Sequence, residues 1–351
     1  MKIKFKLIVV LLAFSCLAFA EKPKFAYEKT KTISKTYATS FNATTSITNL
    51  YGNVNVYLTD QNSVSIQVTI TVSGKNESKV IERLNDINVN FSASNSKVEA
   101  KTVFEGKNYI GTNSISYEIN YIVKIPKNGN VELNNKYGNL YADKINGNTN
   151  ISCKYGSINF GNLEGNSNKI TLGYSQNSTI TNVDDLDLTS QYSELAIQKA
   201  KQISASGNYN TFDFKNCYNL KVNSNYTKIY SDYLGKVVIS GNYLTIKLGE
   251  IGNNIEINSN YSDIRCTNTA KTSSINIDGN YSNIKIYCEA NSNFDFTVST
   301  KHCSFKPGTN VTFTEKSEKG SSGFYSGRYN SAGRNKVNLA TNYGNIEFIK
   351  K

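Results

Sequence analysis

The residues of this chain that could do chemistry are few, and His302 with Cys303 is the first pair to weigh. His302 is the only histidine, and a cysteine close to a histidine can act as a nucleophile. Neighbouring residues of a strand point to opposite faces, however, so adjacent positions cannot form such a pair. His302 also stands where a repeated phrase elsewhere carries tyrosine, which favours a structural replacement.

Acidic residues are the second possibility, because polysaccharide-cleaving enzymes need a positioned pair of carboxylates or a bound cation. Acids recur at no fixed offset, and solvation of a turn explains the one cluster, Asp184, Asp185 and Asp187. The sequence has no phosphate-binding glycine loop, no HExxH motif and no GGxGxD calcium repeat. We therefore predict no enzyme, and no catalytic, cofactor-binding or metal-binding residue.

The cysteines form neither a pairing framework nor a CxxC metal pattern. Three of them occupy slots that are small or apolar in other repeats, so we expect buried thiols that behave as small hydrophobic groups. A disulfide between Cys288 and Cys303 would need neighbouring coils, and their different offsets disfavour it. The three buried positions are Cys153, Cys217 and Cys266.

A repeated phrase organises most of the chain: Asn-Tyr, then Gly or Ser, then one residue, then Ile or Leu. With Tyr174 counted, tyrosines recur every 17 to 20 residues from Tyr137 to Tyr281, a period that indicates stacked coils. The phrase stands at Tyr137, Tyr155, Tyr192, Tyr209, Tyr226, Tyr243, Tyr261, Tyr281 and Tyr343.

Counting from each tyrosine converts the period into geometry. Aliphatic residues fall at −6 and −4, again at +3 and +5, and an apolar slot follows at +8. Each coil should therefore have two short strands and a third short side. Because side chains alternate along a strand, the inward phase must shift after the tyrosine, and we place the corner at the small residue that follows it, such as Gly138.

The tyrosine row could be an exposed platform for sugar rings or an internal or corner stack. Ring contacts in a stack contribute roughly 0.5–1.5 kcal/mol per pair. The −2 position is nearly always small, as at Cys153 and Gly207, which leaves room for a ring folded toward the core and favours the structural role. The asparagines before the tyrosines, such as Asn225, suggest an amide ladder that hydrogen-bonds from coil to coil, in preference to a ligand row.

Residues 1–20 have the composition of a signal peptide, with three lysines, an apolar run and the small residues Ala18 and Ala20. We expect cleavage after Ala20, with a lipoprotein anchored at Cys16 as the alternative. The run is too short to span a bilayer, and no later stretch is apolar enough. We expect export to the periplasm, the outer-membrane surface or the medium.

Residues 21–130 are predicted as a lead-in, a first coil and a β-rich cap. The first coil surrounds Tyr51, residues 63–72 alternate strictly, and Glu77 to Ile87 has one apolar helical face. Two further strands are expected at 97–104 and 115–125.

Residues 131–351 are predicted as the repeat region, with a Gly/Ser-rich loop at 315–335. The fold class is all-β: a single-stranded parallel β-helix of about ten coils, because coils of this length bury their apolar rows only by stacking. The formal charge is +12, and falls to +9 without the three lysines of the leader. This charge is diffuse, which argues against nucleic acid and is compatible with an anionic glycan.

The residues also resemble a known family. The stretch 122–142 (IVKIPKNGNVELNNKYGNLYA), the KYGSI and NYSDI phrases and the final LATNYGNIEFI coil resemble the bacterial adhesin-like family of unknown function DUF4097, over roughly residues 41–351. The resemblance implies the β-helix, its right hand, export and an adhesin role. It brings no catalytic residues, and this chain departs from the pattern at His302 and where tyrosine phrases lack the glycine.

Three functions remain open from the sequence. The first is a non-enzymatic exported solenoid that presents a repetitive surface to cell-envelope components or glycans. The second is a polysaccharide-active enzyme on the same scaffold, which requires two converging carboxylates on adjacent coils. The third is a purely structural envelope protein. The sequence leaves the ligand, the handedness, the oligomeric state, the side of the outer membrane and the lipidation of Cys16 undetermined.

Overall fold

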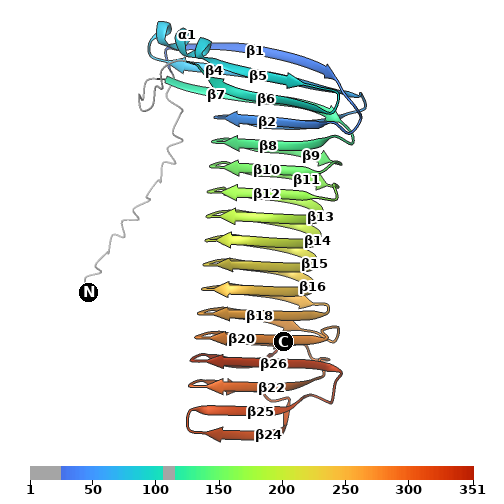
Figure 1. Cartoon of the computed structure of the whole chain (residues 1–351). Coiled ribbons are helices and arrows are strands. Elements are labelled where there is room, and N and C mark those ends of the chain that lie inside the picture. The colour runs from blue at the N-terminus through green and yellow to red at the C-terminus, as the bar shows by residue number, and fades with distance from the viewer. Residues whose placement is uncertain (1–24, 106–114) are drawn as a thin grey trace, which may run out of the picture.

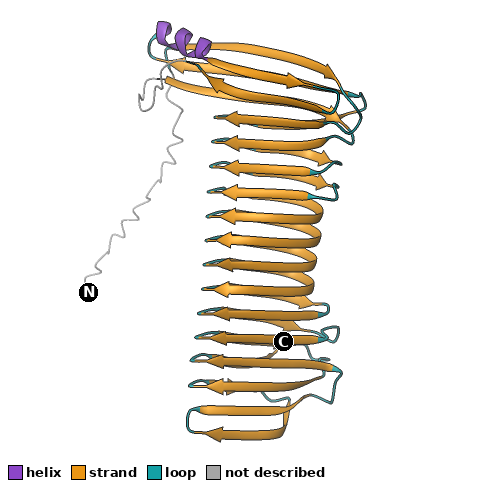
Figure 2. Cartoon of the chain, viewed as in Figure 1, coloured by secondary structure: helices purple, strands orange, loops and turns teal. Residues whose placement is uncertain are grey.

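The computed structural model describes residues 25–105 and 115–351. Its strands wind into one long stack of coils, and α1 (Glu77–Asp86) is the one helix in that part of the chain (Figure 1; Figure 2). The predicted all-β, solenoid-like class is confirmed. The predicted signal peptide, its cleavage site and the Cys16 alternative lie outside the described residues.

Each coil contains a strand before its tyrosine, here called the front strand, and a strand after it, called the back strand. β8 (Asn130–Lys136) and β9 (Leu140–Ile145) form one such pair. The next front strand, β10 (Thr149–Lys154), pairs with β8 in parallel, with Ile151 opposite Leu133. Like positions of successive coils therefore lie one above another, which is the register that the repeated offsets require.

The same arrangement continues along the stack. In the middle coils the back strand of one coil runs without a break into the front strand of the next, in β13 (Ser178–Gln191), β14 (Glu194–Asn208), β15 (Thr211–Asn225) and β16 (Lys228–Asn242). The other strands of this region are β11 (Ile158–Leu163), β12 (Asn168–Gly173), β17 (Thr245–Ile251), β18 (Asn254–Asn260), β19 (Asp263–Asn268), β20 (Ser274–Asn280) and β21 (Asn283–Cys288).

The core lies between the front and back strands and is lined by the predicted offsets. Ile229, Ile246 and Ile264, all at +3, are fully buried, and each contributes roughly 1.5–3 kcal/mol by leaving water. The +8 slot closes the corner opposite the tyrosine. Its members are all buried: Ile145, Leu163, Ala200, Cys217, Leu234 and Ile251.

A β-rich cap closes the N-terminal end. β1 (Tyr27–Ala38), β4 (Ser63–Gly74) and β7 (Ile115–Pro126) form an antiparallel sheet, and β5 (Ile87–Ala93) pairs with β6 (Lys97–Phe104). The first coil, β2 (Thr44–Leu50) and β3 (Val54–Thr59), lies between this cap and the coil of β8 and β9.

The predicted helix is confirmed within one residue, and its sequence explains both ends. The side chain of Asn76 accepts a hydrogen bond from the Lys79 backbone N–H at 3.1 Å, which caps the first turn. Val80 is fully buried and Ile81 is exposed, so one face of the helix packs on β4 and β1. Ile87 leaves the helix in an extended conformation and begins β5.

The C-terminal end differs from the prediction, because the expected loop at 315–335 is mostly a hairpin. β24 (Val311–Lys319) and β25 (Ser322–Tyr329) pair antiparallel, and β25 also pairs with β22 (Phe294–Lys301). Tyr325 and Tyr329 are buried, with Gly327 buried between them, while Arg328 is exposed on the alternate face. The hairpin therefore covers the last coil, and its outer strand carries charges.

The last coils do not stack in chain order. β26 (Asn335–Asn342) lies between β20 and β22, and β27 (Asn345–Lys350) lies between β21 and the short β23 (Ser304–Lys306). The strands of the His302 coil and the hairpin thus precede β26 and β27 in the sequence but lie farther along the stack. The final coil, β26 and β27, lies between the Tyr281 coil and the His302 coil (Figure 1).

Candidate functional site: the tyrosine stack

Every tyrosine of the repeat adopts the left-handed backbone conformation. The φ angles lie between 50° and 63° from Tyr51 to Tyr343, and His302 joins them at 55°. This conformation costs an L-residue roughly 1–2 kcal/mol, so it persists only where something offsets it. The backbone N–H of each tyrosine donates to a carbonyl of the adjoining coil, as Tyr226 does to Asn242 at 3.0 Å.

The tyrosine itself, and not the residue after it, is therefore the corner. The predicted phase shift is present, but it occurs one position earlier. The residue at +1 already points inward, and Ser193, Thr227 and Leu244 are all buried there. In the coils that have glycine at +1, close packing of the backbone explains it. A Cβ on Gly138 would lie 2.0 Å from the Gly52 carbonyl oxygen of the adjoining coil.

The rings form one continuous face-to-face stack along the molecule. Neighbouring ring centroids are 4.7–5.0 Å apart, and the planes differ by 3–13°. With the strand spacing of a sheet, the row is about 50 Å long. Its order is Tyr51, Tyr137, Tyr155, Tyr174, Tyr192, Tyr209, Tyr226, Tyr243, Tyr261, Tyr281, Tyr343 and His302.

The stack lies outside the core, which corrects the expectation that the rings fold inward. Tyr226 is 47% exposed and the other ladder tyrosines are similar. The small −2 residues have another role: they meet the +1 side chain inside the corner. Ser224 Oγ lies 2.6 Å from Thr227 Oγ1, and the same contact recurs two coils later between Ser259 and Ser262. The space under each ring is therefore filled.

The predicted asparagine ladder is confirmed beside the rings. From Asn225 onward, each amide Nδ2 donates to the Oδ1 of the preceding asparagine of the ladder, as Asn260 does to Asn242 at 2.9 Å. The chain of amides runs through Asn208, Asn225, Asn242, Asn260, Asn280 and Asn342. These side chains are used within the fold, so they hold the tyrosine corners in register.

The stacking decides what the tyrosines can bind. Within the row, both faces of a ring are covered by its neighbours, so a sugar ring cannot stack on them. The ring edges and hydroxyls remain open to solvent, and no hydrogen bond from Tyr226 or Tyr243 Oη to another described residue is found. The row is thus a line of amphipathic edges, with Lys136 Nζ lying 4.8 Å over the Tyr137 ring near one end.

The side chains of His302 and Cys303, the pair considered for nucleophilic chemistry, contact different partners. The His302 ring stacks on Tyr343 at 4.7 Å, while the Cys303 thiol donates to the Thr341 carbonyl at 3.2 Å. His302 therefore replaces tyrosine, as predicted. Cys288 and Cys303 are free thiols, and the coil of Tyr343 separates their strands.

The predicted buried thiols are confirmed. Burial raises the pKa of Cys153 to about 11, and those of Cys217 and Cys266 to about 12. Such thiols stay protonated at neutral pH, so they are poor nucleophiles and poor metal ligands. Among the described residues, no group of three or more His, Cys, Asp or Glu side chains is placed to hold a metal ion.

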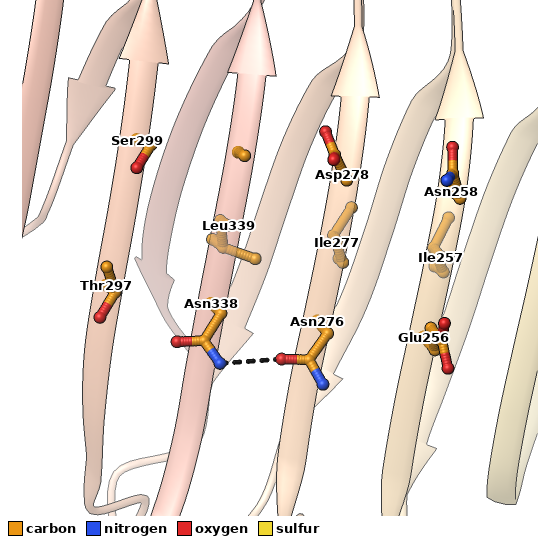
Figure 3. Close-up of a pocket in the computed structure, with 11 residues that line it drawn as sticks. Glu256, Ile257, Asn258, Asn276, Ile277, Asp278, Thr297, Ser299, Asn338 and Leu339 are labelled. Atoms are coloured by element: carbon orange, nitrogen blue, oxygen red, sulfur yellow. Dashed lines mark hydrogen bonds between the residues drawn. The ribbon is translucent and has the colours of Figure 1, made fainter.

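A hollow on the front strands is lined by two carboxylates, Glu256 and Asp278, together with amide, hydroxyl and aliphatic side chains. It has a volume of about 380 Å³, and Ala340 leaves it open between longer polar neighbours. Figure 3 shows Glu256 and Asp278 on adjacent strands, but in different rows: Glu256 is opposite Asn276, and Asp278 is opposite Asn258. The amide of Asn338 donates to Asn276 at 2.8 Å, so a linked pair of amides stands between β20 and β26 in this hollow.

Fold and stack together define a class: a solenoid-like, all-β repeat protein with an external aromatic corner. The family model described as Toastrack DUF4097 matches residues 45–348. The chain belongs to the DUF4097 family, which confirms the resemblance seen in its sequence. None of the helical structure in the described part is long and apolar enough to cross a membrane.

Several solved structures are similar to the chain at low identity. One is a candidate adhesin from Parabacteroides merdae, with 12% identity, 92% of this chain and 97% of that chain covered, and a TM-score of 0.37. Another is a candidate adhesin from Bacteroides fragilis, with 12% identity, 73% and 97% covered, and a TM-score of 0.32. A candidate lipid-binding protein from Parabacteroides distasonis has 10% identity, 92% and 97% covered, and a TM-score of 0.35. The search of curated proteins found no match.

Proposed function

We propose that this protein is a non-enzymatic, exported adhesin that binds extended polymers of the cell envelope or its glycans along the tyrosine row. The observation that carries the proposal is the continuous line of half-exposed tyrosine edges. Exposed aromatic surface of this extent on one side of a molecule is typical of interaction sites. The proposed scaffold is a parallel β-helix of about ten coils, as the repeat period suggests, with the right hand that the family resemblance implies.

The physical advantage of the row is that its side chains are already ordered. A binding partner normally has to immobilise the side chains it contacts, at roughly 0.5–1.5 kcal/mol each. Here each ring inside the row is held by two neighbouring rings, so folding has already ordered most of these side chains before a partner binds. Tyrosine also offers an apolar edge and a hydroxyl together, which suits a polymer with alternating apolar and hydroxyl groups.

The proposal is tested by removing hydroxyls while keeping the rings. In the chain from residue 21 onward, Tyr192→Phe, Tyr209→Phe and Tyr226→Phe are combined, and binding to glycan arrays and to whole bacterial cells is measured. Each lost hydrogen bond contributes about 0.5–1.5 kcal/mol, so we expect binding at least tenfold weaker. The thermal midpoint should change little, because phenylalanine preserves the stack.

A matched control removes three exposed hydroxyls outside the row, by Tyr27→Phe, Tyr57→Phe and Tyr218→Phe. These side chains are 40%, 47% and 56% exposed, which is comparable to the row. The control variant should bind as the wild type does. Equal losses in both variants would place binding elsewhere, and wild-type binding no higher than background on every array and cell would end the adhesin proposal.

A further inference from the structure

A second hollow, on the back strands of the middle coils, has the components of a specific site. It has a volume of about 510 Å³ and lies across β16, β17, β19 and β21, on the sheet opposite the hollow of Figure 3. Unlike that front hollow, it combines aromatic rings with cations. The side chains that matter are Tyr230, Asp232, Lys247, Arg265 and Tyr287, around Gly249.

The floor of the hollow is a glycine at a break in the sheet. The register of β17 against β19 shifts between Leu248 and Glu250, so Gly249 sits at a bulge. A Cβ on Gly249 would lie 2.2 Å from the carbonyl oxygen of Asp232, so no side chain fits there. Thr267, the next residue in the floor, is buried, and Tyr287 opposite it forms the far wall.

The charges around this floor are largely paired, with one exception. Lys215 lies 3.0 Å from Asp213 and 3.9 Å from Asp232, and Arg265 lies 2.7 Å from Asp263. Lys247 is exposed and has no carboxylate within ion-pair distance among the described residues. Its ammonium lies 5.6 Å over the ring of Tyr230. The positive charge of Lys247 therefore lies over the Tyr230 ring without a carboxylate partner, on a strand that also lines the open floor.

The same backbone arrangement occurs once more on this sheet and provides an internal comparison. Tyr141 and Asp143 are followed one coil later by Gly161, whose Cβ would lie 2.0 Å from the Asp143 carbonyl oxygen. That hollow is smaller, about 140 Å³, and Asn159 stands where the larger one has Lys247. Both hollows therefore share the Tyr-x-Asp pattern with a glycine one coil later, but the lysine is present only in the larger one.

We propose that the Tyr230–Tyr287 hollow binds one carboxylate-bearing sugar unit of an acidic polysaccharide. Lys247 Nζ pairs with the sugar carboxylate, the apolar face of the pyranose ring packs on Tyr287, and Asp232 accepts hydrogen bonds from its hydroxyls. Cations give orientation to an anionic ligand and aromatic faces give it contact area. The site uses none of the row tyrosines, so it stands independently of binding along the row.

The test is calorimetric titration of the chain from residue 21 onward with tetragalacturonate, and with the neutral cellotetraose. We expect Lys247→Gln to weaken tetragalacturonate binding about tenfold or more, and Tyr287→Leu to weaken it as well. Lys221→Gln, which removes the same charge from an exposed position on the front face, should change the affinity less than twofold.

Three outcomes would overturn the proposal: no binding of tetragalacturonate, equal losses in Lys247→Gln and Lys221→Gln, or cellotetraose bound as tightly as the acidic sugar. The first would leave the proposed function intact, because the row variant Tyr192→Phe, Tyr209→Phe and Tyr226→Phe is tested on arrays and cells. If the row variant binds normally while Lys247→Gln loses the acidic sugar, the hollow and not the row is the binding site.

Discussion

The two corners of a coil obey different rules. At the tyrosine corner, two or three residues separate the strands in every coil but one, and each coil has a left-handed residue there. The exception follows Tyr174, where Asn177 adds a residue that is itself left-handed, with a φ of 55°. At the opposite corner the connection ranges from an unbroken strand in β14 to five residues at 269–273.

The difference shows which corner sets the register. The tyrosine corner has a stack of rings and a ladder of amides, and both depend on identical positions meeting from coil to coil. The opposite corner is closed by a single apolar side chain, such as Leu234, which tolerates extra residues beyond it. Most of the variation in repeat length is therefore placed where no ladder has to be maintained.

The largest expected effect comes from inserting residues at each corner. One serine inserted between Tyr226 and Thr227 would turn the following strand over and expose its apolar row, which removes several contributions of about 1.5–3 kcal/mol each. One serine inserted after Gly235 would copy the next coil, which has three residues between Ile251 and Ile255 where this coil has two between the paired positions Leu234 and Val237. We expect the first protein to lose cooperative thermal unfolding and the second to melt near the wild type. Similar melting curves for the two variants would refute the conclusion that the tyrosine corner, and not the opposite corner, sets the register.

A smaller effect is expected from single substitutions in the stack. Tyr226 contacts rings at 4.7 Å on both sides, so Tyr226→Ala should lower the free energy of unfolding by about 1–3 kcal/mol. Tyr226→Gly should lose about 1 kcal/mol less, because glycine accepts the left-handed conformation. Urea unfolding compares both with Tyr218→Ala, at the opposite corner, which should be almost neutral. If the alanine and glycine variants match, backbone strain at the corner is negligible.

The smallest effect concerns pH and Cys217, which fills the opposite corner. Its pKa is about 12 in the folded protein against an ordinary 9.0, so the unfolded chain loses this proton first as pH rises. Its contribution to stability is therefore constant below about pH 9 and declines between 9 and 12. Cys217→Ala should flatten the fall of the urea midpoint over this range. An unchanged slope would mean that the thiol reaches water before global unfolding.

Much of the fold could be predicted because the positions of apolar residues, counted from each tyrosine, indicate which side chains are buried. Isoleucine or leucine at +3 in coil after coil leaves few alternatives to a stacked β-solenoid, and the amide ladder follows from asparagine at a constant position. The helix was predictable from Val80 and Leu84 on one face. These signals are local and repeated, so each coil confirms the others.

The features that were missed depend on contacts that no single repeat contains. The order of the last coils was hidden because the strands around Tyr281, His302 and Tyr343 carry equivalent offsets, and any of them could stack on any other. The tyrosines were placed inward because a small −2 residue explains a buried ring as well as it explains a buried hydroxyl pair. The back-face hollow has a sequence signal, Tyr-x-Asp with glycine one coil later, but its cation comes from a third position, Lys247.

The return of the chain at its C-terminal end has a mechanical consequence. β27 is held in parallel pairing by β21 on one side and β23 on the other, so a force applied at Lys350 must shear two ladders at once. β1, at the other end, pairs with β4 alone and can be peeled away one hydrogen bond at a time. Pulled between its ends in a force spectrometer, the molecule should therefore unravel from β1 first, while the coil of Tyr343 holds to the last.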